Sequence, residues 1–310
     1  MQGAPAAFHF CESWGLAVNI RRIDNATPYI LILPAIIVLA AVGLYPFFFS
    51  LSASFTSWYL PDPSTKKFIF LKNYADVLTD GLFWKSVRIM LVFVLTSVFF
   101  EVLLGVIIAL VLDANIIGKK IFRTVLIIPM MITPAVAATL WKSMYNSSYG
   151  VITYLLNSVL QFLSLPPADF SNSPIWAMTG LIVAEVWQWT PFVVLVVLAG
   201  LQSLPRDIYE YAMTEGAREK QLLRYVTLPL IKPYIIVAVL FRIIYESRAF
   251  EIIYLVNQGG PGNSTEHLPL HIFYTGLSWF RFGRACSMSF ILMIATLLFV
   301  FLFAKKIIRL

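Results

Sequence analysis

Residues 209–233 read YEYAMTEGAREKQLLRYVTLPLIKP, and they differ sharply from the sequence on either side. Acids and bases gather here around Gly216, whereas the flanking segments are long apolar runs. Just upstream, Pro205 suits the first position of a helix, where its missing amide is not needed. Asp207 and Glu210 favour the positive end of that helix's dipole. Gly216 is expected to break or turn the helix, because glycine adopts left-handed backbone conformations easily.

A second short helix is expected in REKQLLRYVTLPLIKP, and we predict that it ends at Pro229 and Pro233. Together the two helices form a polar helix–turn–helix of about residues 205–233 between two apolar segments. Any polar loop between membrane spans is often charged and helical, so composition alone leaves the purpose of this one open.

The whole chain has the composition of a membrane protein. Of its 310 residues 59% are hydrophobic and 13% charged, whereas a soluble domain carries roughly 25% charged residues. The net charge of +7 could suggest nucleic-acid binding, but the bases stand beside apolar runs, as the cytoplasmic side of a membrane protein requires. We therefore expect membrane lipid and no nucleic acid among the partners. Cys11 and Cys286 have neither metal nor redox spacing.

Six segments are long enough to cross about 30 Å of hydrocarbon. Lipid cannot satisfy backbone polar groups, so each must be helical, and the predicted fold is an all-α membrane protein of about six transmembrane helices with the helix–turn–helix loop. Five prolines within them predict kinks or breaks: Pro34, Pro46, Pro129, Pro134 and Pro191. The segments are approximately Pro28–Trp58, Ile89–Leu112, Ile121–Tyr145, Ile175–Leu201, Tyr234–Leu255 and Ser287–Ala304.

Lysine and arginine predict the orientation, because they concentrate on the cytoplasmic side. With the N-terminus inside, thirteen of these bases fall on inner segments and six on outer loops, although the first outer loop carries four lysines. We therefore expect a multi-pass membrane protein with both termini cytoplasmic. The predicted organisation is a tail of residues 1–27, a transmembrane domain of residues 28–304, and a tail of residues 305–310.

The polar loop resembles the "EAA" loop of permease subunits of ATP-binding-cassette (ABC) importers. Three residues depart from the usual sequence of this loop. Tyr211 stands where alanine is usual, Glu215 stands where aspartate is usual, and Leu223 replaces a common phenylalanine. All three changes keep charge or apolarity. The matching residues are Glu210, Ala212, Gly216, Ala217, Val226, Leu228, Pro229 and Pro233.

Four further stretches resemble the carbohydrate permeases of this family, of the maltose-permease kind in its six-span form. They are LILPAIIVLAAVGLYPFFFSLSASFTSW (31–58), FLKNYADVLTDGLFWKSV (70–87), LIIPMMITPAVAATLWKSMYNSSYG (126–150) and FEIIYLVNQGGPGNST (250–265). One departure is Phe70, where the family usually has glycine. The matches occur in the family's order and cover nearly the whole chain from Pro28.

The resemblance implies a permease subunit of a binding-protein-dependent sugar importer, which catalyses no bond chemistry itself. Residues 28–304 would be its permease domain, and the membrane would be a bacterial or archaeal cytoplasmic (inner) membrane. A second homologous permease subunit would complete the path, two ATPase subunits would bind below, and an extracytoplasmic solute-binding protein would deliver a saccharide. ATP and magnesium would be held by the ATPases, and this chain would bind no cofactor. The coupling contacts would be Glu210, Tyr211, Ala212, Glu215, Gly216 and Ala217.

Charges inside the predicted spans point to a translocation pathway or to a structural lock. Arg242 and Glu246 are four residues apart, on one face of the fifth span. Arg248 and Glu251 follow near the outer half of that span, and Glu185 lies in the fourth. A lone charge at mid-membrane costs roughly 2.5–3.5 kcal/mol, so such groups usually pair or face a wet cavity. An Arg242–Glu246 ion pair that only joins helices therefore remains an alternative.

The resemblance to the maltose permease implies that the substrate contacts of this chain lie in the fourth and fifth spans. Hydroxyl groups need donors and acceptors, and sugar C–H faces stack on aromatic rings. The charged character of the aligned positions suggests an acidic saccharide anchored by Arg242, unless Glu185 and Glu246 neutralise that arginine instead. The aligned positions are Glu185, Gln188, Trp189, Phe192, Arg242, Tyr245 and Glu246.

The sequence gives little support to other functions. The glycine-rich NQGGPGNST lacks the order of a phosphate-binding loop and is predicted to be an outer turn. His9, His267 and His271 are dispersed, so no metal site is expected. A second hypothesis is a stand-alone secondary transporter driven by an ion gradient, with Glu185 or Glu246 as proton carrier.

Overall fold

The computed structural model describes residues 27–114 and 117–307. Most of the predicted N-terminal tail, with His9 and Cys11, lies outside the described residues, as do residues 308–310. The chain divides into two units, Met1–Ala53 and Ser54–Leu310, and each is described by itself.

The first unit contributes one apolar helix, α2 (Thr27–Ser54), which corresponds to the first predicted span. It carries no charged residue after Thr27 and includes Pro34 and Pro46 within the helix. The span was predicted to reach Trp58, but the helix stops at Ser54. The reason lies in the second unit, where the side-chain amide of Asn73 donates to the carbonyls of Ser54 and Thr56, at 2.9 and 2.8 Å.

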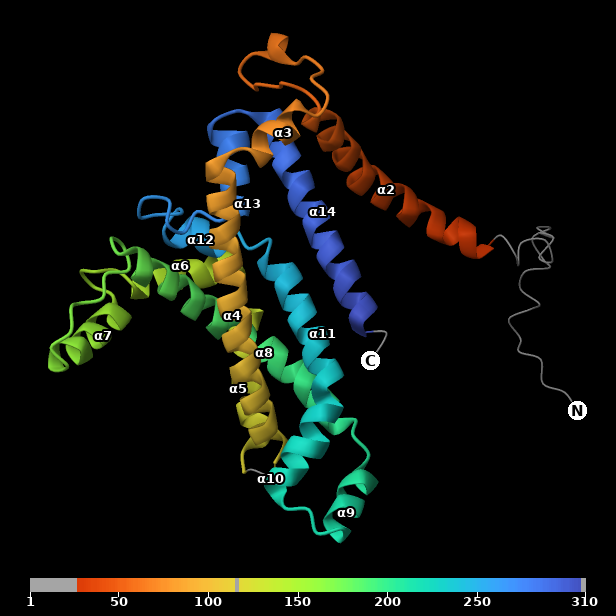
Figure 1. The fold of residues 1–310 in the computed structure, drawn as a ribbon, viewed down its shortest axis with the longest axis vertical. Coiled ribbons are helices and arrows are strands. Elements are labelled where there is room, and N and C mark those ends of the chain that lie inside the picture. The colour runs from red at the N-terminus through yellow and green to blue at the C-terminus, as the bar shows by residue number, and fades with distance from the viewer. Residues whose placement is uncertain (1–26, 115–116, 308–310) are drawn as a thin grey trace, which may run out of the picture. The chain divides into compact units, whose positions relative to one another are not determined.

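Four long helices form the body of the second unit (Figure 1). They are α4 (Gly81–Asp113), α8 (Pro174–Gln202), α11 (Leu228–Glu246) and α14 (Phe282–Ile307). Helix α11 packs against α4, α8 and α14, and the most extensive contact is between α4 and α8. The unit also has three shorter helices, α3 (Lys72–Leu78), α12 (Glu251–Val256) and α13 (Leu268–Phe273), with a π-helical turn at Tyr274–Ser278.

The third predicted span is broken rather than straight. Helix α5 (Lys119–Met131) and helix α6 (Pro134–Met144) meet at an angle of 94°. Pro134 cannot continue the ladder of α5 and forces extended backbone on the residue before it, so α6 starts anew there. A break at a proline was predicted, and this one is confirmed. The following segment also forms a helix that was not predicted, α7 (Val151–Phe162).

The fifth predicted span, Tyr234–Leu255, is displaced toward the N-terminus. Helix α11 ends at Glu246, and residues 247–250 separate it from α12. The predicted end of the preceding loop helix at Pro229 and Pro233 is also wrong. A π-helical segment, Leu222–Thr227, precedes the two prolines, and one continuous helix of 28 residues runs over Glu219–Glu246. At 1.5 Å per residue this helix is long enough to cross the membrane without the polar residues that follow Glu246.

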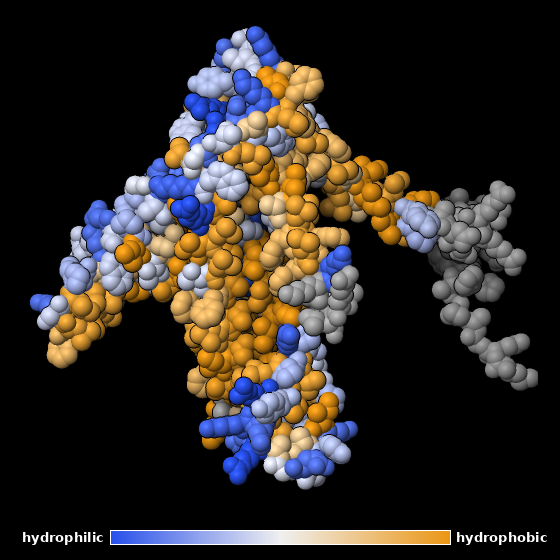
Figure 2. Space-filling model, viewed as in Figure 1, coloured by the Kyte–Doolittle hydropathy of each residue, from blue (hydrophilic) through white to orange (hydrophobic). Residues whose placement is uncertain are grey.

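Among the described residues, five helices are long and apolar enough to cross a membrane, and the bent α5–α6 pair makes six. Figure 2 shows apolar side chains along the middle of the second unit's long helices and polar side chains at its two ends. The prediction of an all-α membrane protein with about six spans is therefore confirmed. The helices α9 (Arg206–Thr214) and α10 (Glu219–Gln221) lie at one polar end, and α3 lies at the other (Figure 1).

The close contact between α4 and α8 depends on Gly105. A Cβ atom at this position would lie 2.6 Å from Cγ1 of Val193 on α8, which no ordinary packing allows. Small residues at such crossings let membrane helices approach until their backbones nearly touch. Val193, Val194 and Val197 around this point are fully buried.

We expect Gly105→Ala to destabilise the second unit by about 1–3 kcal/mol, because the added methyl overpacks the α4–α8 contact. Gly81→Ala is the control, since no atom lies within 4 Å of a Cβ there. Alanine is favoured over glycine in helices, so the control should be neutral or stabilising. Thermal unfolding of the purified protein in detergent measures both; equal stability of the two variants would contradict the assignment.

Candidate functional site

A cavity of about 370 Å³ lies where α8, α11 and α12 meet. The rings of Trp189 and Tyr245 form part of its wall, with centroids 4.5 Å apart. Three charged side chains also reach it: Glu185, Arg248 and Glu251. Aromatic faces beside a few convergent polar groups are typical of a small-molecule binding site.

Behind this wall lies a buried charge cluster centred on Arg242, which is 1% exposed. Its Nε and Nη2 atoms donate to the two carboxylate oxygens of Glu101 on α4, at 2.6 and 2.7 Å. Nη2 also donates to Glu185 on α8, at 3.1 Å, and lies 3.8 Å from Glu246. We call Glu101, Glu185, Arg242 and Glu246 the charge cluster. Its members come from three helices, so it ties α4, α8 and α11 together.

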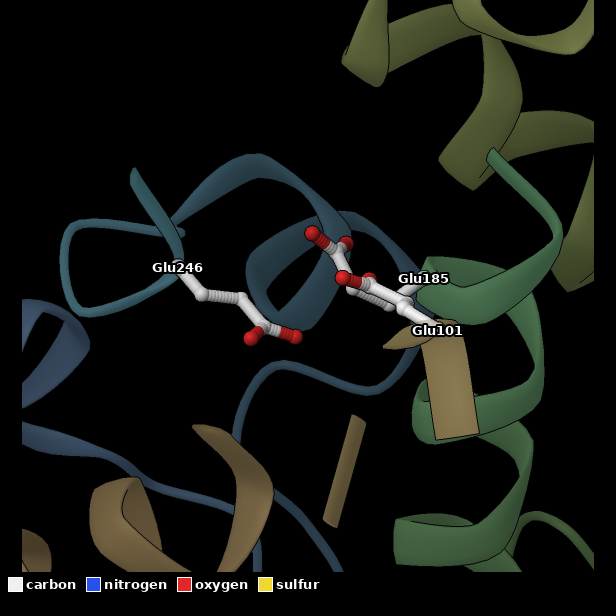
Figure 3. Close-up of side chains that lie close together, drawn as sticks. All are labelled: Glu101, Glu185 and Glu246. Atoms are coloured by element: carbon white, nitrogen blue, oxygen red, sulfur yellow. The ribbon is translucent and has the colours of Figure 1, made fainter. Parts of the chain in front are cut away.

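Figure 3 shows the three carboxylates of the cluster pointing toward one another. One oxygen from each can be chosen so that all three lie within 4.8 Å of one another, and all three residues are buried. In the described part of the chain this is the one group of three or more acids, histidines or cysteines with metal-ligand spacing. The Arg242 guanidinium occupies the space among them, so this group of acids already has its cation.

Arg242 also supports the aromatic wall of the cavity. Its guanidinium carbon lies 4.7 Å from the ring centroid of Trp189 and 5.4 Å from that of Tyr245. Cation–π contacts of this kind stabilise and orient the rings. Arg242 therefore contacts three groups that line the cavity, while it does not line the cavity itself.

The structure brings together most of the residues predicted to contact substrate. Glu185, Trp189 and Tyr245 line the cavity, and Arg242 and Glu246 lie behind it. Gln188 points away and donates to the carbonyl of Ile132, at the break between α5 and α6, at 2.9 Å. Phe192 packs against the apolar core between α4 and α8. The contact of these residues with a substrate remains a prediction.

Sequence reasoning missed Glu101, and it noted Arg248 and Glu251 only as charges near the outer half of the fifth span, not among the aligned substrate positions. Glu101 is an isolated acid in the middle of the second predicted span, and the same rule that drew attention to Glu185 would have found it. Arg248 and Glu251 were placed inside the fifth span, whereas the helix ends at Glu246 and leaves both at the cavity. The displaced end of α11 could not be read from hydropathy alone.

The polar helix–turn–helix forms an elbow of residues 205–227. Pro205 is the N-cap of α9, so the helix begins at Arg206, one residue after the predicted start. Gly216 has φ +85°, where a residue with a Cβ is strained, and it provides the predicted turn. The Tyr209 hydroxyl donates to Oγ1 of Thr227 at 3.1 Å, which fixes α9 against the helix that continues into α11.

The elbow exposes the residues predicted to contact an ATPase. Glu210, Glu215 and Gly216 are exposed, and Ala212 and Ala217 are half-buried. Tyr211 is 71% exposed, although it is large and aromatic. Exposed tyrosine with a charged surround is common at protein interfaces.

The histidines form no metal site in the described residues. His271 Nδ1 lies 2.7 Å from Glu266 Oε1, and His267 instead caps α13. Burial lowers the pKa of His267 to about 4. The segment NQGGPGNST between α12 and α13 is a turn, as predicted, with Gly259 and Gly262 at positive φ.

The fold and site define an integral membrane permease, and comparison with known proteins gives its family. Residues 101–309 match the family described as "Binding-protein-dependent transport system inner membrane component". The chain belongs to this family, and it is a multi-pass transport subunit of the inner membrane rather than an enzyme. The comparisons give no support to a stand-alone secondary transporter.

Individual relatives agree with this family. The chain is 38% identical to the probable ABC transporter permease protein y4oQ of Sinorhizobium fredii, over 89% of this chain and 88% of that protein. It is 36% identical to the trehalose/maltose transport system permease protein MalF of Thermococcus litoralis, over 90% of this chain and 94% of the relative.

A solved structure confirms the fold. The crystal structure of a bacterial ABC transporter involved in the import of the acidic polysaccharide alginate superposes with a TM-score of 0.78 at 22% identity, covering 94% of this chain and 98% of that chain. At this identity the likeness establishes the fold alone.

We expect Arg242→Met to destabilise the protein by about 3–5 kcal/mol, because the buried acids around it would lose their cation. Arg248→Met, six residues on at the exposed cavity surface, should change stability by less than about 0.5 kcal/mol. Thermal unfolding of the assembled complex in detergent compares them. If Arg242→Met kept full stability and assembly but lost uptake, direct contact of Arg242 with substrate would be the better account.

Proposed function

We propose that this chain is one permease half of an ATP-driven importer that receives a saccharide from an extracytoplasmic binding protein. One observation carries the proposal: a continuous helix, Glu219–Glu246, joins the elbow to the cavity. Gly216 precedes the start of this helix, and Tyr245 stands in the cavity wall at its other end. A push on the elbow would therefore move the wall of the substrate site through one rigid element about 42 Å long.

The energy source in this proposal is a pair of ATPase subunits that bind ATP and magnesium and contact the elbow. The chain has no phosphate-binding loop of its own. Tyr211 and Met213, 71% and 53% exposed, offer an apolar surface at the elbow for such a partner. The elbow and both termini then lie on the cytoplasmic side, as the distribution of lysine and arginine favours.

A second homologous permease subunit completes the pathway in this proposal. The cavity is walled by this chain on the side of α8, α11 and α12, and its volume of about 370 Å³ lies at the lower end of the range for ligand sites, about 300–1,000 Å³. A second subunit would close it and share the substrate.

A saccharide fits the chemistry of the cavity. The Trp189 and Tyr245 rings can stack on the C–H faces of a sugar, and Glu185, Arg248 and Glu251 can bind its hydroxyls. A relative 36% identical to this chain is named for trehalose and maltose transport. If the saccharide is charged, Arg248 is the cation that reaches it, because Arg242 is committed to Glu101 behind the wall.

We expect Gly216→Val to uncouple transport from ATP hydrolysis, because a β-branched residue at φ +85° distorts the elbow. Strain of about 1–2 kcal/mol would lower the population of the docking-competent elbow roughly 5–30-fold. Gly262→Val is the matched control: its φ is also positive, +58°, and no atom lies within 4 Å of a Cβ at either glycine. The measurement is the stimulation of ATPase activity by the loaded binding protein. Equal stimulation in Gly216→Val and Gly262→Val would show that the elbow does not couple ATP hydrolysis to transport.

We expect Trp189→Ala to raise the half-saturating substrate concentration for transport by about tenfold, since ring stacking contributes about 0.5–1.5 kcal/mol beyond the buried area. The control is Trp187→Ala on the same helix, because Trp187 packs against Trp141 and faces an apolar groove instead of the cavity. Uptake into proteoliposomes with the complete importer compares them. A loss confined to Trp187→Ala would place the substrate elsewhere.

A further inference from the structure

Glu246 stands out in the charge cluster because its carboxylate has no hydrogen bond. The residue is 0% exposed. Neither of its two oxygens has a partner with hydrogen-bond geometry among the described residues, and the hydroxyl of Ser97, which lies nearby, donates to the carbonyl of Phe93 at 2.8 Å. Its nearest cationic atom, Nη2 of Arg242, is 3.8 Å away, beyond hydrogen-bonding distance. A buried polar side chain almost always has a partner, so an ionised Glu246 would be an exceptional group.

The net charge of the cluster also disfavours an ionised Glu246. Glu101, Glu185 and Glu246 would contribute three negative charges when ionised, and Arg242 contributes one positive charge. The cluster would then bury two net negative charges. Carboxylates held this close in a dry site repel one another strongly, and one of them commonly keeps its proton.

A bound metal ion does not explain how the excess negative charge of the cluster is neutralised. Oxygen ligands surround calcium at about 2.3–2.6 Å, so an ion bound by all three carboxylates would have to lie among them. Nη2 of Arg242 is already there, at 2.7 Å from Glu101, 3.1 Å from Glu185 and 3.8 Å from Glu246. The guanidinium would both block and repel a second cation.

The proton belongs on Glu246 rather than on its neighbours. Glu101 accepts two charge-assisted hydrogen bonds from Arg242, which favour its ionised form. Glu185 accepts a third such bond and also reaches the cavity. Glu246 receives none, and leaving a neutral acid unpaired costs far less than leaving a carboxylate unpaired.

We propose that Glu246 binds a proton and is present as a neutral carboxylic acid while α4, α8 and α11 pack as they do here. The charged and titratable groups that face it are Glu101 from α4, Glu185 from α8 and Arg242 from α11 itself. The site thus holds a proton at the end of the helix that joins the elbow to the cavity. If a movement of α11 admits water to Glu246, water can hydrate the ionised carboxylate, and Glu246 no longer needs to hold the proton.

The test compares isosteric Glu→Gln variants of the full chain in its assembled complex. Glu246→Gln replaces a neutral acid by a neutral amide of the same size, so thermal stability should stay within a degree or two of the unchanged protein. Glu101→Gln removes the ionised partner of Arg242 and should lower the unfolding temperature clearly. If Glu246→Gln is as damaging as Glu101→Gln, Glu246 is ionised and the proposal is overturned.

Infrared spectroscopy gives a direct second readout. The C=O stretch of a protonated carboxylic acid should be present in the unchanged protein and in the exposed-site control Glu219→Gln, and absent in Glu246→Gln. Unfolding is also measured in sodium, potassium, calcium and choline chloride at equal ionic strength. Stabilisation by one metal cation that disappears in Glu246→Gln would show a bound ion instead of a proton, and it would overturn the assignment, as would an infrared band that Glu246→Gln does not change.

Discussion

The arrangement of the second unit depends on a single guanidinium group that several carboxylates share. Arg242 carries the only positive charge of the buried cluster, and Glu101, Glu185 and Glu246 surround it. A buried ion pair gives little net stability compared with apolar packing, but it is costly to break, because each partner left alone is an uncompensated charge. This asymmetry fixes the register of α4, α8 and α11, since any sliding of one helix would separate the charges.

The same group connects the helix register to the binding site. Trp189 and Tyr245 lie on the face of the guanidinium, and Glu185 is shared between the cluster and the cavity. The cavity wall is thus built on the cluster rather than beside it. Tyr245 stands at the end of the helix that starts at the elbow, so the elbow and the cavity wall belong to one continuous helix.

Much of the fold could be predicted because lipid leaves the backbone few choices. Apolar runs of sufficient length predicted six spans, and Pro134 predicted a break that the structure places at 94°. The boundaries of the fifth span were wrong, because hydropathy does not say that a helix can continue through Pro229 and Pro233. The π-helical segment before them has no local sequence signal.

The sequence by itself determined the membrane class, the polar elbow with its turn at Gly216, and the charged residues that had to be paired somewhere within the spans. These follow from local chemistry: hydropathy, backbone conformation and the cost of isolated charge. Only the tertiary structure decided which charges meet. Glu101 is 141 residues from Arg242 in the sequence, and its role depends on how three helices pack, which no single segment encodes. The fold also turned Arg242 inward and left Arg248 at the cavity, because α11 ends at Glu246 and the chain changes direction there.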